Sequence, residues 1–183
     1  FDNGFFDVQV DTAVSVNIED EEASVTFIIT ENNRYRIDTI TINGIENISP
    51  DAQGKVKRIR TIRKGDNYSK VLIIQLANET LDTLQNNGYM NARLHLDSGT
   101  VIRRYKDESR VNVELNLEGA DTMYYFGKTE INIVDNVYGL RTEIPKEEIV
   151  YEEGELYSKA KKLDSERNIA RIPIVSGAKI NPD

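Results

Sequence analysis

The sequence predicts an α+β protein made of tandem modules, each with the order β-α-α-β-β. Two observations carry this prediction: landmarks that recur with a period of 84–91 residues, and a change of apolar spacing inside each repeat from alternation to helical spacing. Such a unit folds as a three-stranded mixed sheet with two helices on one face, a usual layer arrangement of α+β domains.

Three landmarks define the repeat. Residues 65–70, Gly-Asp-Asn-Tyr-Ser-Lys, recur 89 residues later as Gly-Glu-Leu-Tyr-Ser-Lys, and residues 3–7, Asn-Gly-Phe-Phe-Asp, recur 84 residues later as Asn-Gly-Tyr-Met-Asn. The third landmark aligns Tyr35, Ile40 and Ile42 with residues 126, 131 and 133, an offset of 91. Their common order predicts the C-terminal hairpin of a first module at 1–31, a complete module at 32–120 and a partial module at 121–183.

In the complete module, alternating Tyr35, Ile37, Ile40 and Ile42 predict a first strand that ends at Asn43-Gly44. A helix capped by Ser49 or Asp51 is expected to run to Gly65, and a longer helix is expected from Ser69 to Gly88. Its Ile73, Ala77, Leu81 and Leu84 are spaced to face a core. A strand over 89–97, a turn over 103–108 and a strand over 111–117 complete the unit.

The flanking segments follow the same pattern. Alternation over 5–16 and 23–29 around an acidic turn predicts a hairpin. A strand over 124–134, helices near 143–151 and 156–168, and a strand over 171–175 are expected in the third unit, which lacks a third strand.

Composition excludes several classes of function. The 183 residues include 23 basic and 31 acidic side chains, a net charge of −8, which disfavours binding to nucleic acid. With no cysteine and one histidine, the chain has no disulfide, thiolate zinc site or thiol nucleophile, so no metal or cofactor is expected. His95 alternates with Leu94 and Leu96 and is expected to be a solvated strand residue. Phosphate-binding loops and nucleophile-elbow motifs are absent, and no enzymatic activity is expected.

The β-α-α-β-β unit resembles the POTRA domain. The match is sharpest over residues 84–92, where a leucine is followed by Gly88-Tyr89 and by Ala92; Tyr35 to Gly44 and the Gly-x-x-Tyr-Ser landmark also match, so that the resemblance covers most of 32–160. It departs at Thr129, where an apolar residue is usual.

The resemblance implies the periplasmic arm of an outer-membrane β-barrel protein of the BamA/TamA type, in a Gram-negative bacterium. It implies a non-enzymatic scaffold that receives unfolded outer-membrane proteins or accessory periplasmic proteins, with a C-terminal β-barrel outside this sequence. The chain begins without a start methionine, so we expect an internal or mature fragment.

In this family the strand after the long helix lies at the sheet edge, where a client strand can pair by β-augmentation. The resemblance therefore places partner binding on the predicted edge strand, at Tyr89, Met90, Asn91, Ala92, Arg93, Leu94 and His95. A counterpart edge is expected at residues 5–12.

A second candidate surface is basic. Six of the ten residues 55–64 are Lys or Arg, and Lys57, Arg60 and Lys64 are expected on the helix face opposite its apolar stripe. A solvated helix face is one interpretation, and contact with an anionic outer-membrane surface or an acidic partner is the other.

Two alternatives remain at this level. The arm of a two-partner secretion transporter would use the same modules for one exported client. A surface adhesin or glycan-binding protein built on α+β repeats belongs to a different class and would lack the barrel.

Overall fold

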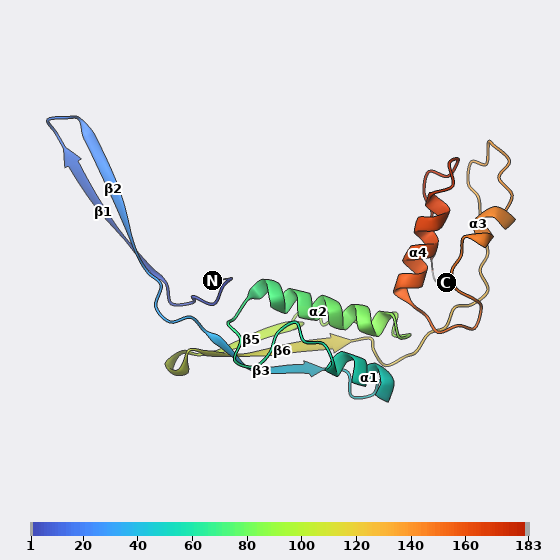
Figure 1. Ribbon diagram of the computed structural model, residues 1–183, viewed down its shortest axis with the longest axis horizontal. Coiled ribbons are helices and arrows are strands. Elements are labelled where there is room, and N and C mark those ends of the chain that lie inside the picture. Colours follow the sequence, from blue (N-terminus) through green and yellow to red (C-terminus); the bar gives the residue numbers. More distant parts are fainter. Residues whose placement is uncertain (1, 182–183) are drawn as a thin grey trace.

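The computed structural model describes residues 2–181 (Figure 1). Its strands are β1 Gln9–Asn17, β2 Glu22–Thr30, β3 Arg36–Asn43, β4 Arg93–Leu94, β5 Thr100–Tyr105 and β6 Arg110–Glu118. Its α-helices are α1 Pro50–Lys57, α2 Lys70–Gln85, α3 Glu143–Glu147 and α4 Lys159–Ala170, and the short 3-10 helix η1 covers Lys106–Glu108.

The central sheet is mixed, as predicted. β6 pairs in parallel with β3 on one side and antiparallel with β4 and β5 on the other. Because β4 and β5 both pair with β6, at opposite ends of it, the sheet is three strands wide. Figure 1 shows α2 lying along one face of this sheet, with α1 at the end of β3.

The core lies between the sheet and the helices. Alternate residues of β6, Val111, Val113, Leu115 and Leu117, are buried, and α2 packs Ile73, Leu76, Ala77 and Leu84 against the sheet. A second cluster at the α1 end contains Ala52, Val56 and Tyr89. The predicted alternation and the predicted helix face are therefore both confirmed in the complete module.

The helix starts agree with the sequence, but the end of α1 does not. The Ser49 side chain accepts a hydrogen bond from the Ala52 amide, and the Ser69 side chain accepts one from the Leu72 amide. The first helix stops at Lys57 rather than near Gly65. Val56 belongs to one core cluster and Ile62 to the other, so the chain leaves the helix axis to bury both.

β1 and β2 form a separate two-stranded sheet that projects away from the rest of the chain (Figure 1). Its register repeats that of β5 and β6: Thr12 pairs with Phe27 as Thr100 pairs with Leu115, and Val14 pairs with Val25 as Ile102 pairs with Val113, all at an offset of 88. The offset of 88 residues lies within the 84–91 period of the sequence landmarks.

The edge strand of the complete module contains an insertion that the hairpin lacks. The pair Leu94–Leu117 matches the hairpin pair Val10–Ile29, but the two residues lie at different offsets: 84 residues from Val10 to Leu94 and 88 residues from Ile29 to Leu117. The offset of β6 from β2 is therefore 88 residues throughout, while the edge strand opposite β6 has four extra residues, 95–98, between β4 and β5. At this point Asn116 accepts a hydrogen bond from the His95 amide and donates one to the Gly99 carbonyl, both at 2.9 Å. The four residues loop out between β4 and β5.

This insertion corrects two predictions. The strand expected over 89–97 is limited to Arg93–Leu94, because residues 89–92 form turns and 95–98 loop out. The turn expected over 103–108 begins later, since Arg103–Tyr105 belong to β5.

The strands expected over 124–134 and 171–175 are also wrong. Residue 125 makes only an isolated bridge to Leu156, and α3 and α4 are shorter than expected. β3 is held by β6 along its length, and the described residues 2–181 contain no counterpart of β6 for the segment 124–134. An extended segment without a neighbour has no ladder of hydrogen bonds.

Candidate strand-pairing edge

β4 and β5 together form one edge of the central sheet. Within residues 2–181, β6 is the strand that pairs with β4 and with β5. Asn116 donates to the Gly99 carbonyl, and antiparallel pairs alternate between residues that bond across the ladder and residues that do not. The amides of Thr100, Ile102 and Arg104 therefore point away from β6.

Arginine residues line this edge. The Arg103 Nε lies 2.7 Å from a Glu114 oxygen, and this hydrogen bond raises the pKa of the guanidinium further above its usual value. The Arg93 Nε lies 2.8 Å from Glu118, and the Arg104 guanidinium lies 5.1 Å from the centre of the Phe6 ring. Arg103 and Arg93 thus bind acidic residues of β6, and Arg104 lies against an aromatic ring.

The seven residues expected to form the edge are divided by the structure. Tyr89 and Ala92 are buried, and the Tyr89 hydroxyl accepts a hydrogen bond from the Ser49 amide. Met90 and Asn91 lie in the turn after α2, and the Asn91 side chain donates to the Tyr124 hydroxyl. Arg93 and Leu94 lie on the edge, and His95 opens the inserted loop, with its ring 3.8 Å from Glu118. The sequence placed the edge too early.

The missed part of the edge is Thr100–Tyr105. Its β-branched and aromatic content was a strand signal, but Arg103, Arg104 and the charges that follow suggested a turn. On an edge strand such charges are common, because one flank of the strand meets solvent.

β1 is a second edge, and it is continuous. Its nine residues pair without interruption with β2. One face of this hairpin is exposed and, apart from Thr12, apolar: it contains Val10, Val14, Val16, Ala23, Val25, Phe27 and Ile29.

The basic residues Lys57, Arg60 and Lys64 do not share a helix face, because α1 ends at Lys57. Lys57 donates to the Gln53 side chain, the Arg60 guanidinium donates to the backbone carbonyls of Lys57 and Ile59, and Lys64 lies 2.9 Å from Asp38. Contact of these residues with an anionic surface stays a prediction.

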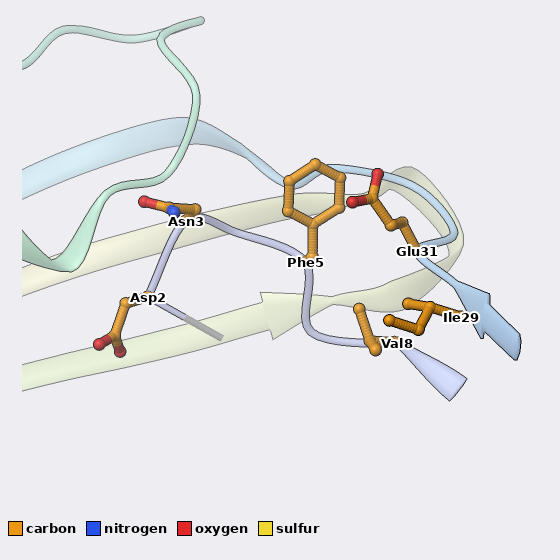
Figure 2. Close-up of a pocket in the computed structure, with 6 residues that line it drawn as sticks. All are labelled: Asp2, Asn3, Phe5, Val8, Ile29 and Glu31. Atoms are coloured by element: carbon orange, nitrogen blue, oxygen red, sulfur yellow. The ribbon is translucent and has the colours of Figure 1, made fainter. Parts of the chain in front are cut away.

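A small pocket of about 460 Å³ lies at the base of the hairpin (Figure 2). Val8 and Ile29 lie next to one another in it, while the carboxylates of Asp2 and Glu31 lie at opposite ends (Figure 2). The two carboxylates therefore do not converge on a common point.

No group of three or more metal-binding side chains is brought together within residues 2–181. In the same part of the chain, no helix has the length and apolar character needed to span a membrane.

The similarity of this chain to known proteins lies in its structure. No protein-family model and no curated sequence matches the chain. The crystal structure of POTRA domains 3–5 of BamA from Haemophilus influenzae is similar to this chain, with 18% sequence identity and a TM-score of 0.58. The alignment covers all of this chain and 70% of the BamA chain. A structure of BamA from Haemophilus ducreyi lacking POTRA domains 1–3 aligns with 69% of this chain and 21% of its own, at 15% identity and a TM-score of 0.40.

The chain therefore has the fold of POTRA domains. The resemblance found in the residues of the complete module is confirmed at the level of the fold by the match to the three BamA domains.

Proposed function

We propose that this chain is the periplasmic POTRA region of an outer-membrane β-barrel assembly or translocation factor. In this role it is a scaffold without catalytic chemistry that receives unfolded outer-membrane proteins, or accessory periplasmic proteins, at its sheet edges. The POTRA fold and the unpaired edge of β5 support the proposal.

The modular division is part of the same proposal: residues 1–31 are the C-terminal hairpin of one module, 32–120 a complete module and 121–183 part of a third. Its support is the shared register of β1–β2 and β5–β6 at an offset of 88 residues.

The observation that carries the function is the direction of the free amides on β5. Thr100, Ile102 and Arg104 offer donors on the side away from β6, in a strand whose own ladder is already complete. A client strand that pairs here contributes main-chain groups, so binding tolerates many side-chain sequences. Each contact is weak, and several edges on one arm raise the affinity through effective concentration.

The edge prediction of the sequence is accordingly revised. We retain Arg93 and Leu94, add Thr100–Tyr105, and assign Tyr89 and Ala92 to the core.

The test is a proline substitution that removes one outward amide. Thr100 is exposed, and Thr100→Pro removes a donor without breaking a bond to β6. We expect it to weaken binding of an extended peptide with alternating polar and apolar residues about tenfold, the loss of about one hydrogen bond together with steric exclusion. Thr100→Val keeps the amide and serves as the control.

Binding is measured by fluorescence anisotropy of the labelled peptide. Equal affinity of the native protein, Thr100→Pro and Thr100→Val would remove the β5 edge from the proposal. A peptide methylated on alternate backbone nitrogens tests the same bonds from the client side and is expected to bind weakly.

A further inference from the structure

The turn after α2 contacts the segment that begins the following module, and the first copy of the Asn-Gly motif, near the N-terminus, makes a matching contact with residue 35. At the first joint, the Tyr35 amide donates to the Gly4 carbonyl at 2.9 Å. At the second, the Tyr124 amide donates to the Gly88 carbonyl at 2.8 Å. Gly4 and Gly88 are the glycines of the Asn-Gly landmark, so two distant copies of one motif make the same bond.

A second backbone hydrogen bond also occurs at both joints. The Tyr68 amide donates to the Tyr35 carbonyl at 2.9 Å, and the Tyr157 amide donates to the Tyr124 carbonyl at 3.0 Å. Tyr68 and Tyr157 are the tyrosines of the Gly-x-x-Tyr-Ser-Lys landmark. Tyr35 thus corresponds to Tyr124, at an offset of 89, and the alignment of Tyr35 with Phe126 at an offset of 91 is wrong.

The long helix of each following module is capped from the module before it. The first amide of α2, at Lys70, donates to the Asp2 carbonyl at 3.0 Å. The second amide of α4, at Ala160, donates to the Asn86 side chain at 2.7 Å, and the Ser158 hydroxyl donates to the same oxygen. The first turn of a helix has amides without an intrahelical acceptor, so these contacts satisfy donors that the helix cannot satisfy by itself.

An ion pair accompanies each joint. Lys70 lies 3.5 Å from Asp2, and Lys159, the lysine of the second landmark copy, lies 2.8 Å from Asp82. Both pairs are exposed and add little energy, but they are consistent with the orientation that the backbone bonds define.

Glycine is required at these turns for space as well as for conformation. Gly88 has φ +92°, and a Cβ there would lie 2.7 Å from side-chain atoms of both Leu156 and Met123 in the following module. At Gly4, with φ +88°, a Cβ would lie 3.1 Å from the Tyr68 Cβ. The close approach of two modules therefore depends on the missing side chain.

We propose that the Asn-Gly turn and the Tyr-Ser segment that recur in the sequence form a docking device between modules: the turn after the long helix binds the segment that begins the next module, at Tyr35 or Tyr124, and the start of its long helix, and holds that module in one orientation. The partner of this surface is the following module of the same chain. The edges of successive modules are then held at a fixed separation and angle, whatever those edges bind.

The test compares two glycines that share a backbone conformation. Gly88→Ala introduces a Cβ into the joint, whereas Gly65→Ala, at φ +89°, places a Cβ where no atom lies within 4 Å. Both changes strain a left-handed turn, and only the first one acts on the joint. Since the chain has no cysteine, spin labels are introduced at Asn78→Cys on α2 and Ala170→Cys on α4, both exposed.

Pulsed electron paramagnetic resonance on the whole chain then measures the distance distribution between the labels. We expect one narrow peak for the native sequence and for Gly65→Ala, and a distribution about twice as wide for Gly88→Ala, because modules without a close interface move relative to one another. Asn86→Ala, which removes the capping oxygen without changing the turn, is expected to widen the peak to a smaller extent.

Circular dichroism verifies that each variant retains its helices. A native distribution as broad as that of Gly88→Ala would overturn the proposal, and so would narrow distributions in both Gly88→Ala and Asn86→Ala. Because no client takes part in this measurement, its result is independent of the peptide-binding test.

Discussion

The hairpin β1–β2 and the strand pair β5–β6 have the same register and opposite burial. Val113 and Leu115 on β6 are 0% exposed, whereas Val25 and Phe27, at the matching positions of β2, are 52% and 65% exposed. The difference is the helix layer, since α2 covers β5–β6 and nothing within residues 2–181 covers the hairpin face. Strand pairing is thus encoded in the strands themselves, while the core requires the helices.

The comparison also separates two kinds of edge. β1 presents nine residues in one run, whereas the corresponding edge of the complete module is divided into β4 and β5 by the loop 95–98. Leu96 in that loop is 92% exposed, so the loop is not held by apolar packing.

The largest expected effect comes from truncating matched core positions. Leu115→Ala removes a fully buried side chain and is expected to lower the free energy of unfolding by about 2–5 kcal/mol. Phe27→Ala, at the matching position of the hairpin, is expected to change it by less than about 0.5 kcal/mol. Urea unfolding followed by circular dichroism measures both, and equal losses would mean that the hairpin face is covered in solution.

An intermediate effect is expected from removing the inserted loop. Deletion of residues 95–98 joins Leu94 to Gly99 and is expected to produce one continuous edge strand like β1, with stability changed by less than about 1 kcal/mol. An even number of residues keeps each side chain on its face of the sheet. Cross-strand contacts in nuclear magnetic resonance spectra report the pairing.

Deletion of residues 96–98 is the control for this prediction. An odd number reverses the faces on one side of the junction, so either Leu94 or Ile102 loses its contact with the core. This variant is expected to be clearly less stable than the four-residue deletion, and equal stability of the two deletions would contradict the assignment of the insertion.

Sequence patterns predicted β3, α2, β6 and the start of α1, because each apolar stripe there has a partner that buries it. They missed β5, whose charged residues indicated a turn. They failed at residues 95–98, where a looped insertion has no periodic signal, and at 124–134, where the pattern of a strand is present without a neighbouring strand. The edge was predicted too early in the sequence because local alternation does not distinguish a buried turn residue from a strand residue. Tyr89 lies in the turn after α2, and its ring is buried in the core.

The smallest expected effect concerns Asp38 on β3. This strand pairs with β6 and has no counterpart in the two-stranded β1–β2 sheet. A hydrogen bond from Lys64 holds the pKa of the Asp38 carboxyl below its usual value. A lowered pKa in the folded state stabilises the protein above the unfolded pKa of about 3.9, and this contribution is lost as the pH falls through the lower folded value.

Lys64→Met is expected to move the Asp38 pKa up toward its usual value and to reduce the dependence of stability on pH below about 4. Nuclear magnetic resonance titration of the Asp38 carboxyl measures the shift. Lys106→Met, a change at an exposed lysine of η1, is the control and is expected to leave that pKa unchanged. An unshifted Asp38 in the Lys64→Met variant would contradict the assignment.

The contact between Asn86 and the start of α4 has a consequence for the order in which the chain acquires structure. A chain that grows during synthesis presents its N-terminal part first, so Asn86 and the turn that holds it are available before residues 158–160. Each folded unit then acts as a template that lowers the cost of nucleating the next long helix, as in other repeat proteins with nearest-neighbour coupling. During synthesis, this contact therefore favours formation of α4 after α2.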